Sequence, residues 1–71
     1  MKVRVECYAG SKADERPVRF WLHDREYEVN EVADQWYGPE DTFFKVRAGD
    51  GWYVLRVSRD GEWALEAFRR G

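Results

Sequence analysis

The stretch that most constrains the fold is residues 43–58, FFKVRAGDGWYVLRVS, in which two runs of strand-forming residues flank Asp50 and Gly51. An Asp-Gly pair between two such runs is a strong signal for a tight β-hairpin. If Asp50 and Gly51 form the loop, Val46 lies opposite Leu55, and one face becomes wholly apolar because strand side chains alternate between faces. The apolar face then contains Phe44, Val46, Ala48, Tyr53, Leu55 and Val57. We therefore expect this hairpin to form the centre of the core.

The opposite face of the same hairpin is basic. It carries Lys45, Arg47 and Arg56 together with Phe43 and Val54. In the expected register Lys45 lies directly opposite Arg56, and like charges at such positions are mildly destabilising. Either a neighbouring acidic residue or a binding partner is expected to relieve this repulsion.

Alternating apolar and polar residues predict two strands on the N-terminal side of the hairpin. Residues 2–8 alternate in this way, and residues 18–22 do the same, so each is expected to form a half-buried strand. Residues 9–16 between them are small and polar, which is typical of a loop. A short helical turn at 12–16 is an alternative within that loop.

A third strand is expected after a turn at positions 23–24 or 24–25, and it ends at Trp36. Its apolar phase slips between Val29 and Val32, which are three residues apart. Such a slip predicts a β-bulge, which adds one residue to a strand and bends it. We therefore expect a sharply bent strand.

The last strand is expected at residues 62–68, after an Arg-Asp-Gly turn. A two-residue loop would set Val57 opposite Ala64. A three-residue loop with Gly61 in the left-handed conformation would set Val57 opposite Trp63 instead. We favour the three-residue loop because it keeps the apolar face continuous.

Six short strands joined by tight turns, without a sustained period of 3.6 residues, predict an all-β antiparallel meander. A sheet of this size must curl or be covered to protect its edges. We expect a small, partly open barrel of SH3-like size, with a small two-layer β-sandwich as the alternative. With 71 residues the chain is long enough for one domain, which we assign to residues 1–71.

The composition limits the classes of function. A net charge of −2, with both signs interspersed, gives no reason to expect nucleic acid or an anionic membrane as a partner. The longest apolar run, WYVL, is far too short to cross a bilayer, and the first residues lack the apolar segment of a signal peptide. A single cysteine fits a reducing compartment, so we expect a cytoplasmic protein.

Residues suited to catalysis or metal binding are sparse. The chain has one histidine, His23, and one cysteine, Cys7, which together cannot complete a zinc site. Cys7 falls on an apolar strand face, where a thiol is usually inert. Glu26 and Glu28 share an exposed strand face. We expect Glu28 to form a cross-strand ion pair with Arg19. A raised carboxylate pKa, which catalysis would need, is not expected because it requires burial. We predict no catalytic residue, metal ligand or cofactor, and a small enzyme is the least favoured alternative.

Two groups of residues are candidate binding surfaces. The basic face of the central hairpin, with an Arg and a Trp of the second strand nearby, is suited to single-stranded nucleic acid. Glu26, Glu28 and Glu31 would neutralise it if they lie alongside. An aromatic pair where the third strand meets the loop at 37–41 either covers an open end of the barrel or anchors a protein contact. The candidate binding residues are Arg19, Trp21, Trp36, Tyr37, Lys45, Arg47, Trp52 and Arg56.

Several segments also carry a recognisable pattern over nearly the whole chain: VECYAG, RPVRF, YEVNEV, DQWYGP, FKVRAGDGWYVLR and WALE. The pattern RPxxF…YxVxEVxDxWYGP…FKVRxxDGxxYxLR…WxL resembles that of a family of small uncharacterised bacterial cytoplasmic proteins. The chain departs from the pattern at His23 and Asp24, where the family has glycine, and at Trp52, where a polar residue is commoner. The resemblance implies a stand-alone cytoplasmic protein and supplies no activity.

The sequence therefore predicts a cytoplasmic, non-enzymatic binding or assembly module. We expect protein–protein interaction or self-association through an exposed edge strand, because an edge strand invites pairing with another chain. Weak, non-specific binding of single-stranded nucleic acid is the alternative.

Overall fold

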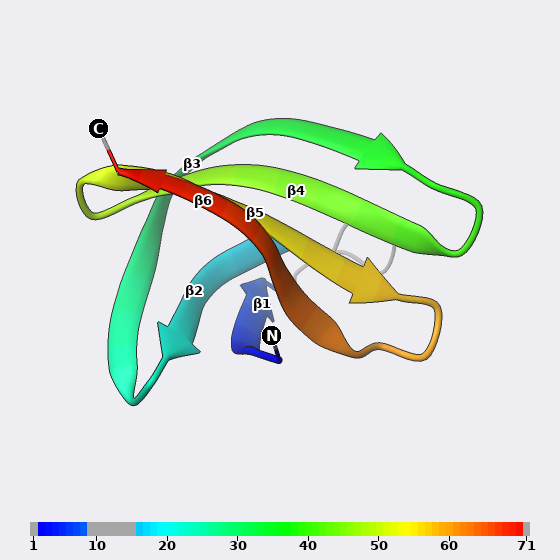
Figure 1. The fold of residues 1–71 in the computed structure, drawn as a ribbon, viewed down its shortest axis with the longest axis horizontal. Coiled ribbons are helices and arrows are strands. Elements are labelled where there is room, and N and C mark those ends of the chain that lie inside the picture. The colour runs from blue at the N-terminus through cyan, green and yellow to red at the C-terminus, as the bar shows by residue number, and fades with distance from the viewer. Residues whose placement is uncertain (1, 9–15, 71) are drawn as a thin grey trace.

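The computed structural model describes residues 2–8 and 16–70, and within these ranges the chain forms six strands and no helix (Figure 1). The strands pair in chain order as one antiparallel meander. This confirms the all-β prediction, whereas the expected loop and helical turn at residues 9–15 lie outside the described residues. The strands are β1 (Arg4–Tyr8), β2 (Arg16–Leu22), β3 (Arg25–Tyr37), β4 (Asp41–Ala48), β5 (Gly51–Ser58) and β6 (Trp63–Arg70).

The long strand β3 gives the sheet its curvature. Its first residues pair with β2, and from Val29 onward it pairs with β4. The register shifts between Val29 and Glu31, as the slip in apolar phase predicted, and shifts again between Val32 and Asp34, which was not predicted. Because bulges bend a strand and increase its twist, β3 carries the chain from one side of a half-barrel to the other (Figure 1).

The barrel closes at one end only. The Val3 amide donates a hydrogen bond to the Trp63 carbonyl over 3.2 Å, and Lys2 forms a bridge with Ala64. Because this bridge is antiparallel, β6 continues beyond Ala64 in the direction away from β1. Residues 65–70 of β6 therefore have β5 on one side and no described strand on the other.

The core lies between the inward faces of β2, β4 and β5. Phe20, Val46, Ala48 and Leu55 have no exposed surface, and Phe44 is nearly as buried. Burying a side chain of the Leu or Phe class contributes about 1.5–3 kcal/mol. The apolar face that the hairpin sequence predicted is thus the face that the protein buries.

The central hairpin nevertheless forms in a different register from the predicted one. Its loop consists of Gly49 and Asp50, one residue earlier than expected, and Val46 lies opposite Tyr53 instead of Leu55. Gly49 has a φ of 59°, which glycine adopts without strain at the first position of a type II′ turn. Each partner is displaced by two residues, and a shift of two keeps every side chain on its own face.

The other turns follow the predictions. His23 and Asp24 form the β2–β3 turn, which is the first of the two expected alternatives. The three-residue loop between β5 and β6 sets Val57 opposite Trp63, with Gly61 at a φ of 84°. The favoured register of the last hairpin is therefore confirmed.

A bulge in β6 was not predicted. The register shifts so that Leu65 lies opposite Leu55 while Ala67 lies opposite Val54, which leaves Glu66 as the extra residue. Beyond the bulge Ala67 lies on the outer face, and Phe68 faces inward. The strand also runs to Arg70, beyond the predicted end at residue 68.

Candidate binding site

The predicted site residues do not form one surface. On β2, the Arg19 guanidinium bridges two carboxylates, with Nε 2.8 Å from Glu6 Oε1 and Nη1 3.0 Å from Glu26 Oε2. Glu28 lies opposite Arg19 in the backbone register, but the ion pairs are with Glu6 and Glu26 instead. Arg19 is therefore neutralised locally.

The predicted aromatic residues lie apart from one another. The Trp21 ring lies under the Arg4 guanidinium, 4.6 Å from its Cζ atom. Trp36 stacks on Phe43 with ring centroids 5.5 Å apart and the planes nearly parallel. Trp36 is 40% exposed and Tyr37 is 74% exposed, so neither ring covers the core as a plug would.

Arg56 is separated from the other basic residues by its partners. Its guanidinium contacts Glu66 Oε1 at 3.1 Å and Asp41 Oδ2 at 3.7 Å. In the observed register Arg56 lies opposite Phe43, so the expected repulsion with Lys45 does not arise. Arg56 is therefore neutralised by Asp41 and Glu66, on β4 and β6, which were not among the acids that the sequence suggested.

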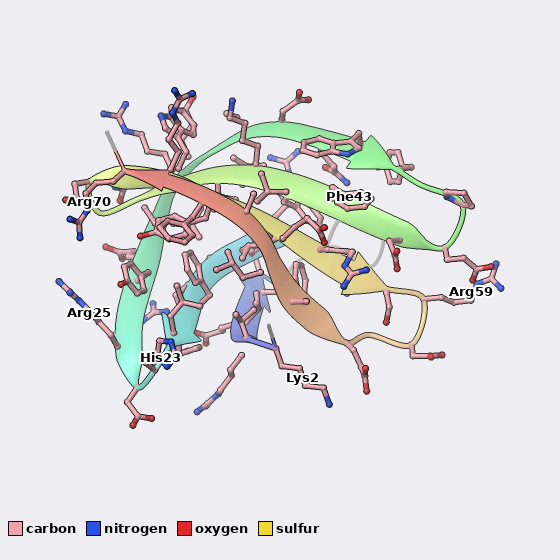
Figure 2. All side chains as sticks on the ribbon, viewed as in Figure 1. Lys2, His23, Arg25, Phe43, Arg59 and Arg70 are labelled. Carbon is pink, nitrogen blue, oxygen red and sulfur yellow. The ribbon has the colours of Figure 1, made fainter. Side chains whose placement is uncertain are left out.

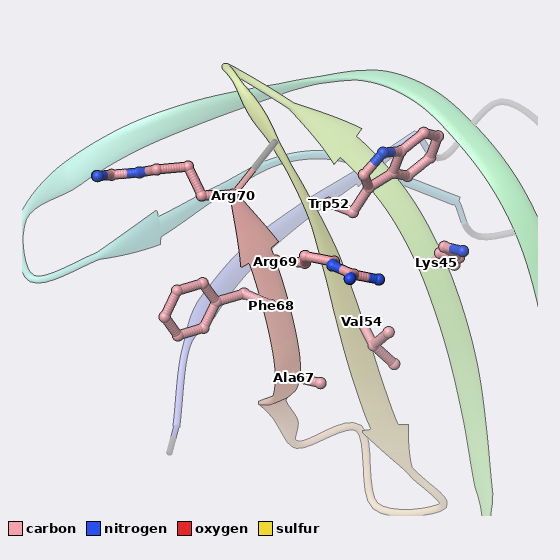
Figure 3. Close-up of a pocket in the computed structure, with 7 residues that line it drawn as sticks. All are labelled: Lys45, Trp52, Val54, Ala67, Phe68, Arg69 and Arg70. Carbon is pink, nitrogen blue, oxygen red and sulfur yellow. The ribbon is translucent and has the colours of Figure 1, made fainter.

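Three predicted residues do come together. Lys45 Nζ lies 5.2 Å and Arg47 Cζ lies 5.6 Å from the centroid of the Trp52 ring. Arg69 on β6 lies opposite Trp52 and completes a basic cluster around the indole (Figure 3). Sequence reasoning missed Arg69 because it placed the residue beyond the end of the last strand.

Lys45, Trp52 and Arg69 of this cluster line a cavity of about 410 Å³ on the outer face of the sheet, which we call the outer hollow. Arg47 lies beside it, on the far side of the indole from Arg69. The floor of the outer hollow is formed by the short side chains of Val54 and Ala67, on β5 and β6. In Figure 3, Phe68 and Arg70 point away from these side chains, toward the other face of the sheet. Both residues still line the edge of the outer hollow, which otherwise lies on the convex side of the half-barrel.

A second cavity, of about 430 Å³, lies on the inner side, where the barrel is open. It lies between the β2–β3 turn and the uncovered part of β6, and we call it the inner groove. Figure 2 shows His23 and Arg25 at the turn and Arg70 at the end of β6. The groove is lined by Leu22, His23, Arg25, Tyr27, Asp50, Tyr53, Leu65, Phe68 and Arg70.

The wall of the inner groove is aromatic. The Tyr53 ring lies 5.4 Å from Tyr27 and 6.1 Å from Phe68, measured between centroids. Phe68 faces inward yet is 68% exposed, because no described strand covers that side of β6. Burial raises the pKa of the Tyr53 phenol, and the neighbouring Tyr27 hydroxyl adds to the increase.

The rim of the inner groove is basic. Arg25 and Arg70 form no ion pair with any described carboxylate, and Arg25 rests over the Tyr27 ring at 5.6 Å. Asp50 is the one acidic residue among those that line the groove. In a chain of net charge −2, this rim therefore favours an acidic ligand.

The remaining chemistry-bearing groups are scattered. Within residues 2–8 and 16–70, no three His, Cys, Asp or Glu side chains gather in a way that could hold a metal ion. In the same ranges no helix is long and apolar enough to cross a membrane. Cys7 is half-buried on β1.

No family model, curated protein or solved structure matches the chain. The function must therefore be argued from the geometry of the two cavities.

Proposed function

We propose that this protein is a non-enzymatic protein-interaction module, which binds an extended segment of a partner protein as an added strand beside β6. The observation that carries the proposal is the backbone of residues 65–70, which no described strand covers on the side away from β5 and which lies directly beside the inner groove. An uncovered strand presents a row of unpaired N–H and C=O groups. Peptides that add a strand to such an edge gain affinity from those backbone groups and specificity from the adjoining pockets.

The groove also limits the chemistry of the segment. Alternate side chains of an added strand point to the same face, so every second one would enter the groove. Apolar side chains there would contact Phe68 and the two tyrosines, and would cover surface that is now open to water. A carboxylate at one end would meet Arg25 or Arg70. The expected ligand is thus an extended segment with alternating apolar residues and at least one Asp or Glu.

Selection from a library of displayed random peptides tests the proposal. Binders to the wild-type protein should be enriched in alternating apolar residues with acidic neighbours, and a synthetic selected peptide should lose most of its affinity for Phe68→Ser. Tyr37→Ser is the matched control, because Tyr37 is an equally exposed aromatic outside the groove. The proposal fails if no sequence pattern is enriched, or if the two substitutions weaken binding equally.

A second copy of the chain is the competing occupant of the same edge. Sedimentation at high micromolar concentration distinguishes the two, because a partner-binding module should remain monomeric without its peptide. If the wild type forms a dimer and Phe68→Ser dissociates it, the occupant of the edge is a second copy of the chain and not a segment of another protein.

A further inference from the structure

We propose that the outer hollow is a second binding site, distinct from the groove proposed above, and that its ligand is single-stranded nucleic acid. One base would lie against Trp52, and the neighbouring phosphates would meet Arg47 and Arg69. The two cavities lie on opposite faces of β5 and β6 (Figure 3), and they share Phe68 and Arg70 at the edge of β6.

The positions of the cations support this assignment. Arg47, Trp52 and Arg69 lie side by side on β4, β5 and β6. Because adjacent strands are about 4.8 Å apart, the two arginine backbones lie about 10 Å apart, with the indole between them. A charged backbone that crosses the strands would thus pass one cation on each side of a stacking platform, the arrangement by which single-stranded nucleic acid is usually held.

These cations are also available. Neither Lys45, Arg47 nor Arg69 forms an ion pair with a carboxylate of the described residues, whereas Arg19, Arg56 and Arg59 each do. Lys45 and Arg47 are held over the indole by cation–π contacts instead. Such exposed side chains change rotamer within nanoseconds, so both cations can turn to a phosphate while a base takes their place on the ring.

The outer hollow has room for a base next to the indole. Val54 and Ala67 are short, so the surface next to the Trp52–Arg69 pair is recessed and apolar. An acidic peptide would use the cations but would leave the indole and this recess unfilled. The combination of a flat ring, an apolar floor and flanking cations therefore favours a base that carries phosphates.

Two acidic neighbours limit the affinity. Glu31 lies opposite Arg47 and Asp34 lies opposite Lys45 on the adjoining strand β3. They reduce the positive potential without forming ion pairs with these cations. Binding should therefore be weak, at about 10⁻⁴ M or weaker in physiological salt, as for non-specific complexes, and stronger when salt is low.

Titration of a labelled oligothymidylate, followed by fluorescence anisotropy at several salt concentrations, tests the proposal. Arg69→Gln should weaken binding several-fold and reduce the slope of log K against log salt by about 0.7, because one phosphate contact is lost. Trp52→Ala should weaken binding about tenfold or more at every salt concentration, and Trp52→Phe, which keeps a ring, should restore part of the affinity.

Two controls separate the site from general attraction and from the inner groove. Arg59→Gln removes the same charge at a loop position paired with Glu40. Arg25→Gln removes it at the rim of the inner groove, at a residue that does not line the outer hollow, so both should leave binding unchanged. No binding at low salt would overturn the proposal. Equal losses in Arg59→Gln and Arg69→Gln, or equal competition by polyglutamate with no effect of Trp52→Ala, would overturn it too.

Discussion

Tyr53 is the residue at which the core and the inner groove meet. Only 8% of it is exposed, and its ring contacts Phe20 with centroids 5.1 Å apart. Burial raises the pKa of its phenol, and Tyr27 and the charge of Asp50 add to the increase, whereas Arg70 opposes it. The wall of the groove is therefore part of the packed core, so a ligand there would meet a preformed surface.

The raised pKa of Tyr53 predicts a pH dependence of stability. Because the folded protein holds the phenol proton more tightly, the unfolded chain releases it first, at its ordinary pKa of about 10. The stability contributed by this group is complete below that pH and is lost as the pH rises above it. Urea unfolding at increasing alkaline pH should show a smaller decline for Tyr53→Phe than for the wild type. Tyr37→Phe, at an exposed position, should leave the decline unchanged, and an unchanged decline in Tyr53→Phe would contradict the assignment.

The β2–β3 turn predicts a stabilising substitution. Asp24 has a φ of 68° and follows His23 at 50°, and a left-handed conformation costs about 1–2 kcal/mol for most residues other than glycine. Asp24→Gly should therefore raise the free energy of unfolding by about 0.5 kcal/mol, after the added flexibility of the unfolded chain is subtracted. Asp60→Gly makes the same change where φ is not positive, so it should lower stability. Shifts of the same sign in both variants, measured by thermal or urea unfolding, would contradict this account.

At the scale of the strands, the sequence predicts which face is buried better than which residues pair. Asp50 has a glycine on each side, so either dipeptide satisfies the local requirements of a tight turn. In the folded protein Gly51 is the first residue of β5, where a Cβ atom would lie 2.6 Å from the Arg69 carbonyl oxygen of β6. The requirement for glycine at position 51 therefore comes from the close approach of β6. A local sequence pattern does not reveal this contact, because β6 is distant in the sequence.

Of the bulges in β3 and β6, one could be predicted from the sequence and the other could not. The bulge after Val29 is visible in the sequence because β-branched residues on both sides reveal the change of phase. The bulge at Glu66 is hidden because Ala67 and Phe68 are both apolar, and either could belong to the core face. Because the bulge turns Phe68 inward and Arg69 to the outer face, the sequence did not predict either residue as part of a binding site.

The inner groove could not be predicted from any single stretch. Its residues come from the β2–β3 turn, the start of β5 and the end of β6, and only the curvature of the whole sheet brings these together. The sequence did place Lys45 and Arg47 on one face of the central hairpin, but it did not place Trp52 beside them. It did not identify the acidic partners of Arg19 and Arg56, since these partners lie on other strands.

At the scale of the whole molecule, incomplete closure of the barrel is the feature from which the proposed function follows. β1 reaches β6 only near Trp63 and Ala64, and the rest of β6 is left without a second neighbour among the described strands. Phe68 and Arg69 are adjacent in sequence but serve opposite faces (Figure 3). Arg69 lines only the outer hollow, so its substitution should remove one proposed site and leave the other.

Backbone amide hydrogen exchange in residues 65–70, measured without and with a selected peptide, tests this claim most directly. In the free protein, the alternate amides of β6 that face away from β5 should exchange fast, as unpaired groups do, while those of β5 exchange slowly. A saturating peptide should slow these β6 amides, because an added strand forms backbone hydrogen bonds with them. Slow exchange of all β6 amides in the free monomer, or unchanged fast exchange in the complex, would contradict the claim that β6 is an open edge which accepts a strand.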